Sequence, residues 1–145
     1  MPSESYSTGE PQNAADREGL SDTATRAEMT PSAVQAMTEL ELRWKLTSGE
    51  VSQLIGGVAV SMWDSWKQYP PDALTAEQLS RISLLLGIFA ALHVLHDDQL
   101  ADQWVRRPNT NELFGGSTPL DSMIEGGVTT MLQVRALLDS RRAGQ

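Results

Sequence analysis

The sequence contains no cysteine, which excludes disulfide bonds, thiolate metal sites and a cysteine nucleophile. Histidine is almost as scarce: only His93 and His96 occur, followed closely by Asp97 and Asp98. Two imidazoles on one helix face are able to ligate a metal, but no third histidine is present, and both positions continue an apolar seam. We therefore interpret them as histidines of the core or its boundary, and we expect neither a metal nor a cofactor.

Positive charge is also in short supply, with 11 Lys and Arg against 19 Asp and Glu and a formal net charge of −8. This balance argues against a general affinity for phosphate backbones and suits a basic protein partner better. Long apolar runs are missing as well, because the run of residues 82–95 is shorter than the about 20 residues that cross a bilayer. Without a secretory leader either, the chain is expected to be cytoplasmic, away from membranes.

The sequence also lacks recognisable catalytic motifs. The serines fall mostly in the N-terminal segment, at helix caps and in turns, and no nucleophile elbow stands out. The pairs Gly115-Gly116 and Gly126-Gly127 lack the residues that would make either a phosphate-binding loop or a dinucleotide fingerprint. The acidic residues gather at helix starts, where capping explains them. We do not expect an enzyme.

What is present is a succession of apolar stripes at helical spacing, after a polar beginning. Residues 1–29 carry six acidic residues and almost nothing large and apolar, so they are predicted to be a disordered acidic tail. Helices are then expected at residues 31–45, beginning at Thr30-Pro31, and at residues 59–68. Two more are expected to follow capping boxes, one at Thr47–Glu50 and one at Thr75–Gln78. The remaining helices are expected from Asp97 to Val105 and on both sides of Gly126-Gly127.

No segment alternates with β-branched residues in the manner of a strand, so the fold class is predicted to be all-α. The helix after Thr75 is apolar nearly all round and is expected to be the surrounded central helix. Trp63 is expected in the core because it falls on the helical stripe at 59–68, and Trp66, near the end of that helix, is expected to be half exposed. We expect two parts: a compact helical unit at 30–74, and a second at 75–145 that includes the central helix.

Residues 46–68 match a helix-turn-helix in length, because a capped helix, a glycine turn and a second helix follow one another. A recognition helix reads bases with exposed Arg, Lys, Asn or Gln side chains. The second helix here carries Val60, Met62 and Asp64, and its candidate DNA-binding residues are few: Ser61, Ser65, Lys67 and Gln68. The fold signal is stronger than the signal for reading DNA, and DNA-binding regulation stays open as an alternative function.

The C-terminal half resembles the toxin-binding domain of the Xre/MbcA/ParS antitoxins. The family pattern joins a leucine-rich helix, an A-x-x-W helix, a P-N turn, an F/L-x-G-x-x-P-L segment and a glycine before a final helix that ends in R-x-x-L. The matching residues are Ala101 with Trp104, Pro108-Asn109, Phe114 with Gly116 and Pro119-Leu120, Gly126 or Gly127, and Arg135 with Leu138. With the preceding unit, the resemblance covers about residues 31–142.

The resemblance implies an antitoxin whose partner is a RES-domain toxin that consumes NAD, with the C-terminal domain covering the toxin's active site. Some family members also form homodimers and bind DNA of their own promoter, although the neutral to acidic second helix weighs against promoter binding here. On this basis the candidate toxin-binding residues lie in the turn after residue 105 and in the final helix: Arg106, Pro108, Asn109, Phe114, Gly116, Pro119, Leu120, Arg135, Arg141 and Arg142.

Overall fold

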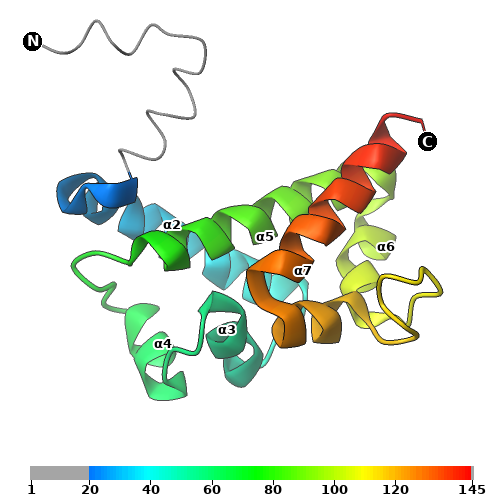
Figure 1. Ribbon diagram of the computed structural model, residues 1–145. Coiled ribbons are helices and arrows are strands. Elements are labelled where there is room, and N and C mark those ends of the chain that lie inside the picture. The colour runs from blue at the N-terminus through cyan, green and yellow to red at the C-terminus, as the bar shows by residue number, and fades with distance from the viewer. Residues whose placement is uncertain (1–19, 145) are drawn as a thin grey trace, which may run out of the picture.

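The computed structural model describes residues 20–144, which form helices and connecting turns and contain no β-strand (Figure 1). The predicted all-α class is confirmed for this part of the chain. The elements follow in the order α2 (Thr23–Arg43), α3 (Ser48–Ile55), α4 (Val60–Trp66), α5 (Ala76–Leu95), α6 (Asp98–Gln103), the 3₁₀ helix η2 (Trp104–Arg106) and α7 (Pro119–Arg142).

The predicted tail of residues 1–29 needs a correction at its C-terminal end. Residues 1–19 lie outside the described part of the chain, but α2 already begins at Thr23, so the predicted helix start at Thr30-Pro31 is wrong. Pro31 lies inside the helix instead. The polar composition of residues 23–29 concealed a helical segment whose stabilising contacts come from elsewhere in the fold.

Asp22 provides the N-cap of α2. Its carboxylate accepts a hydrogen bond from the backbone N–H of Ala24 at 3.2 Å and from the Thr25 hydroxyl at 2.8 Å. The hydrogen bonds from the Thr25 hydroxyl and then from the Ala24 amide hold the pKa of Asp22 below its ordinary value. An acid at this position also interacts favourably with the positive end of the helix.

Thr30 joins α2 to the segment before α5. Its side chain is fully buried, and its hydroxyl donates to the carbonyl oxygen of Arg26 at 2.6 Å. The same hydroxyl accepts a hydrogen bond from the backbone N–H of Leu74 at 2.9 Å. One side chain therefore satisfies a buried backbone donor that lies 44 residues away in the sequence.

The two short helices α3 and α4 follow the predicted pattern. Thr47 and Glu50 form the capping box of α3, and Gly56 ends the helix with a φ of 122°, which suits glycine. On α4, Trp63 is completely buried, as expected. Met62 is 49% exposed, because the short helix has one inward side and Trp63 occupies it.

Helix α5 is the central helix and packs against α2 on one side and α7 on another (Figure 1). The predicted capping box of Thr75 and Gln78 is present at its start. The expectation that neighbours surround it completely is wrong, because Ser83, Ala90 and Val94 line an exposed side. It is the one described helix long and apolar enough to cross a membrane, and it packs against both α2 and α7.

Helix α7 changes direction at Gly127. Thr118 caps its start by accepting a hydrogen bond from the backbone N–H of Asp121 at 3.0 Å, and Pro119 occupies the first turn. Gly127 has φ 66° and ψ −144°, a backbone conformation that is essentially restricted to glycine. The predicted interruption at Gly126-Gly127 is therefore confirmed as a kink between two helical segments.

The hydrophobic core is one continuous cluster to which every described helix contributes. Trp44 at the end of α2, Trp63 of α4, Trp104 of η2 and Met131 of α7 all belong to it. The predicted units 30–74 and 75–145 therefore share their interior, and the division between them stays a prediction about function.

Candidate functional site

The turn between η2 and α7 is closed by its own hydrogen bonds. The backbone N–H of Asn109 donates to the carbonyl of Ser117 at 3.2 Å. The Asn109 side chain accepts from the N–H of Asn111, and the Asn111 side chain accepts from the N–H of Leu113, both at 2.9 Å. These two side-chain turns fix the backbone without a regular element. We call residues 107–118 the closed loop.

Phe114 anchors the closed loop to the core. Its ring meets Trp104 edge to face, with the centroids 5.9 Å apart and an interplanar angle of 81°. Phe114 is 4% exposed and Leu120 is 1% exposed, and Pro119 is also buried. The structure thus places three of the candidate toxin-binding residues inward, where they hold the surface in shape.

The tip of the closed loop carries Gly115 and Gly116, with φ values of 55° and 89°. Both lie in the left-handed region that favours glycine, and open space surrounds them. Pro108, at the other end of the loop, is exposed, and Asn109 is partly exposed. Among the candidate residues of the loop, these three positions present themselves to a partner: Pro108, Asn109 and Gly116.

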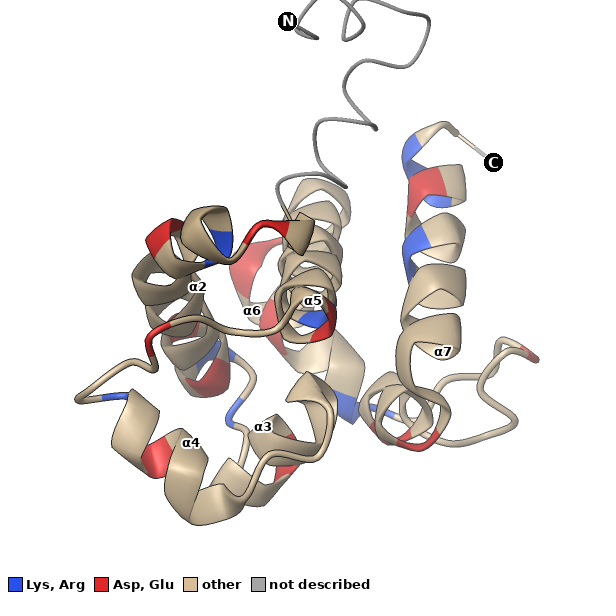
Figure 2. Cartoon of the chain, turned by 60° about the vertical axis from the view of Figure 1, so that its left-hand side comes forward, with Lys and Arg blue, Asp and Glu red and all other residues tan. Residues whose placement is uncertain are grey.

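The outer segment of α7, residues 128–142, carries three arginines and one carboxylate and is the more basic end of the helix (Figure 2). The Arg135 Nε atom lies 3.2 Å from both carboxylate oxygens of Asp139, and the Arg142 Nη1 atom lies 3.9 Å from one of them. One carboxylate therefore faces two guanidinium groups, and Arg141 adds a further positive charge. Leu132 is 53% exposed on the same segment, a feature that the sequence analysis missed.

Arg135 rests over the backbone of α5 at Gly87. A Cβ atom built at Gly87 would lie 1.8 Å from Nη1 of Arg135, so the absence of a side chain there makes the room for the guanidinium. Sequence inspection gave no reason to connect these residues, because the α5–α7 packing brings them together. The glycine inside an otherwise apolar helix was the available signal.

Arg106 serves the junction between the two halves of the chain. Its Nε donates to the carbonyl of Trp44 at 2.8 Å and its Nη2 to that of Lys45 at 2.7 Å, and Nη2 also pairs with Glu50 at 2.5 Å. Lys45 has a φ of 55°, unusual for a residue with a side chain. The candidate contact residue Arg106 is thus engaged by its own chain, where it secures a turn.

The outward side of α4 offers little to a nucleic acid. The candidate residues Ser61, Ser65, Lys67 and Gln68 are all exposed. However, the Lys67 Nζ atom lies 3.4 Å from carboxylate oxygens of both Glu41 and Asp64. The positive charge at the end of α4 is therefore offset by two negative ones.

His93 is held in place by neighbouring residues of the fold. His93 stacks on Phe89 with centroids 4.1 Å apart, and its Nδ1 atom lies 2.9 Å from the Phe89 carbonyl oxygen. Its Nε2 atom lies 3.1 Å from Asp102 and 3.2 Å from the Nη2 atom of Arg43. Within residues 20–144, no three His, Asp or Glu side chains are grouped so as to hold a metal ion.

Comparison with known proteins identifies the family of the C-terminal part of the chain. Residues 90–144 match the antitoxin Xre/MbcA/ParS C-terminal toxin-binding domain, a stretch that contains the closed loop and all of α7. The chain belongs to this antitoxin family.

A relative is the uncharacterized protein y4oB of Sinorhizobium fredii (strain NBRC 101917 / NGR234), which is 34% identical over 115 residues. The alignment covers 79% of this chain and 87% of that protein. Because it is longer than the toxin-binding domain, the similarity extends into the helices that precede it.

Proposed function

We propose that this chain is the antitoxin of a type II toxin–antitoxin system, which binds a cognate RES-domain toxin and neutralises it by covering its NAD-consuming active site. The observation that carries the proposal is the toxin-binding family match over residues 90–144, the region of the closed loop and α7. The chemistry belongs to the partner in this proposal. The antitoxin is not an enzyme and acts in the cytoplasm, where the toxin meets NAD.

The rigidity of the closed loop supports a role in binding. Its Asx turns, its backbone bond to Ser117 and the Phe114 anchor hold the backbone before any partner arrives. A surface that is already ordered loses less conformational entropy when it binds, so more of the contact energy appears as affinity. In this proposal the buried residues Phe114, Pro119 and Leu120 contribute indirectly, because they hold the loop in its bound shape.

The outer segment of α7 supplies the groups suited to direct contact. Leu132 is a half-exposed apolar side chain, and Arg135 lies one helical turn further on. Interfaces concentrate their binding energy in apolar anchors and arginines that become fully desolvated. We therefore add Leu132 to Arg135, Arg141 and Arg142 as the direct contacts, together with the loop positions Pro108, Asn109 and Gly116.

The test is neutralisation of the RES-domain toxin encoded beside this chain, in cells that produce both proteins, with growth and cellular NAD as the measurements. Deleting residues 118–145 is unsuitable, since it removes the core residues Leu120, Met131 and Leu138. Leu132→Asp is the sharper change, because the side chain is exposed and its loss leaves the core intact. It should weaken toxin binding about 30-fold or more, the effect of losing an interface hot spot.

Leu42→Asp is the matched control. Leu42 is 68% exposed on α2, so the same change is made at a similarly exposed leucine outside the proposed surface. It should leave NAD and growth protected. Full protection by Leu132→Asp combined with Arg141→Glu and Arg142→Glu would contradict the proposed surface, and a RES-domain protein that stays active with excess wild-type chain would contradict the function.

A further inference from the structure

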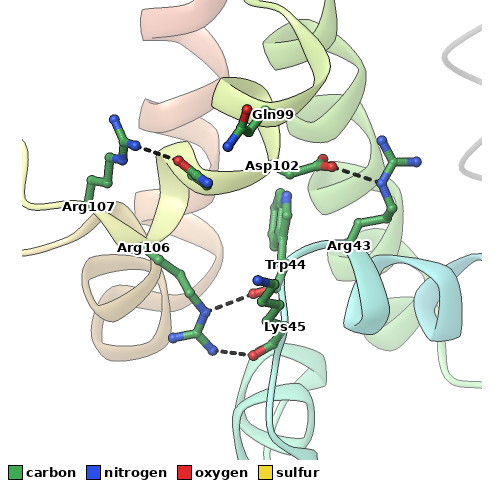
Figure 3. A pocket seen from close by; sticks show the side chains of 8 residues that line it. Arg43, Trp44, Lys45, Gln99, Asp102, Arg106 and Arg107 are labelled. Atoms are coloured by element: carbon green, nitrogen blue, oxygen red, sulfur yellow. Dashed lines mark hydrogen bonds and ion pairs between the residues drawn. The ribbon is translucent and has the colours of Figure 1, made fainter.

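A recess of about 460 Å³ lies between the C-terminal end of α2 and the α6–η2 corner, next to the first residue of the closed loop (Figure 3). Four cationic side chains line it. Arg43 and Lys45 come from the α2 side, and Arg106 and Arg107 come from η2 and the residue after it. Such a gathering of positive charge is unexpected in a chain with a net charge of −8.

One carboxylate, that of Asp102, also lines the recess, and it is offset within the structure. Its Oδ2 atom lies 2.9 Å from Nε of Arg43, and its Oδ1 atom lies 3.1 Å from Nε2 of His93. The side chain of Asp102 is 21% exposed. Asp102 therefore pairs with Arg43, and Arg106 pairs with Glu50 outside the recess, so Lys45 and Arg107 are the lining cations without a carboxylate partner among the described residues.

The cations keep unused hydrogen-bond donors. Lys45 makes no ion pair or side-chain hydrogen bond with any described residue, so its ammonium group is free. Arg107 contacts the side-chain oxygen of Gln103 through Nη2 alone, which leaves its other N–H groups available. Arg106 uses Nε for Trp44 and Nη2 for Lys45 and for its ion pair with Glu50, and it retains the donors of Nη1. A guanidinium has five N–H donors, so each wall offers several to a bound acceptor.

The indole of Trp44 adds a second kind of observation. The side chain is completely buried beside the recess, and its Nε1–H has no hydrogen-bond partner among the described residues. Figure 3 shows this indole between the α2 end and Asp102 of α6. A buried donor without a partner costs free energy unless an acceptor or an ordered molecule reaches it.

We propose that this recess is a binding site for a small, multiply charged oxyanion, carrying phosphoryl or carboxylate groups, that bridges its two walls. Two charged groups are needed because each wall offers one cation without a carboxylate partner: Lys45 on the α2 side and Arg107 on the η2 side. Guanidinium and ammonium groups form strong, charge-assisted hydrogen bonds with such oxygens. The bound anion would connect the end of α2 to η2, the same junction that Arg106 already spans.

Isothermal titration calorimetry of the full chain with inorganic pyrophosphate and, separately, with citrate tests the proposal at low ionic strength. We expect binding of at least one probe, weakened by added salt because the walls are open to solvent. Lys45→Gln combined with Arg107→Gln should weaken that binding about tenfold or more. Both side chains are exposed, so the variant should retain its circular dichroism spectrum and melting temperature.

Lys67→Gln is the control, since it removes a lysine charge at the C-cap of α4, outside the recess. It should leave the affinity unchanged. The tighter of the two probes distinguishes a phosphoryl site from a carboxylate site. The proposal is overturned if neither probe binds at millimolar concentration, or if the double variant binds as tightly as the wild type. The Leu132→Asp comparison tests toxin neutralisation separately, at a residue that does not line the recess.

Discussion

The closed loop and the α3–α4 pair show two ways to build a surface from short segments. The closed loop has little regular structure, yet Asn109, Asn111 and Phe114 fix its shape and leave its outer groups unengaged. The α3–α4 pair is regular, but its exposed lysine is already neutralised by two carboxylates. Regular secondary structure is therefore a poor guide to which surface is available to a partner. Unpaired charged groups and a backbone that is already fixed are better indicators.

The largest loss of stability is expected from Phe114→Ala, which should disorder the closed loop and leave α3 and α4 folded. The change removes the edge-to-face contact with Trp104 and opens a cavity in the core. Loss of a buried phenylalanine destabilises a protein by about 3–5 kcal/mol. Urea unfolding monitored by circular dichroism measures this loss.

Hydrogen exchange then locates the effect of Phe114→Ala. The amides of Leu113 and Ser117 should lose protection well before those of α3. Uniform loss of protection in the loop and in α3 would show that Phe114 supports the whole core and not the loop in particular.

Thr30→Val should have the second largest effect, and it sharpens the comparison by weakening the α2–α5 framework beneath both surfaces. Valine has nearly the same shape as threonine, but it leaves the Leu74 amide without its acceptor. A buried unsatisfied donor costs about 1–3 kcal/mol. The melting temperature should fall while exchange in the closed loop rises no more than exchange in α3. Thr38→Val, at a partly buried threonine of the same helix, is the control.

Gly87→Ala should change stability by less than about 1 kcal/mol while changing the α7 surface. Alanine is favoured over glycine inside a helix, but its Cβ needs the space now held by the tip of Arg135. The arginine side chain is flexible and is expected to move. Toxin binding, measured by surface plasmon resonance, should therefore weaken at nearly constant melting temperature. A large loss of stability would mean that the α5–α7 packing cannot adjust.

The smallest effect concerns Asp22, far from both surfaces. Because its pKa is lowered in the folded chain, the ionised carboxylate stabilises the fold above the ordinary value near 3.8, and the contribution is lost as the pH falls through the lowered pKa. Asp22→Asn should therefore show a lower melting temperature than wild type at pH 7, and the difference should shrink toward pH 3. A difference that does not depend on pH would assign the effect to packing instead of charge.

Local signals in the sequence predicted most helix boundaries. The capping boxes at Thr47 and Thr75 and the break at Gly127 depend on residues within one turn of each other, and all three are present. Their physical cause is local, namely the unpaired backbone groups at helix ends.

Features that depend on distant contacts were not predicted. The early start of α2 includes Thr30, whose hydroxyl reaches Leu74, and no periodicity within residues 23–29 reveals that bond. The same limit applies to the candidate site: local sequence identifies its region, and distant contacts decide which of its side chains are exposed. The motif located the region, but only the packing showed that Leu132 is exposed.

The turn at Lys45 carries a consequence for how separable the two halves of this protein are. A left-handed backbone conformation at a residue with a side chain is unfavourable by about 1–2 kcal/mol, and here the carbonyl groups of Trp44 and Lys45 are held by Arg106, which lies about 60 residues further along the chain. Grafting the toxin-binding half onto another N-terminal unit would leave that arginine without its acceptors. The transferable module for protein engineering is therefore longer than the family domain: it has to include the end of α2.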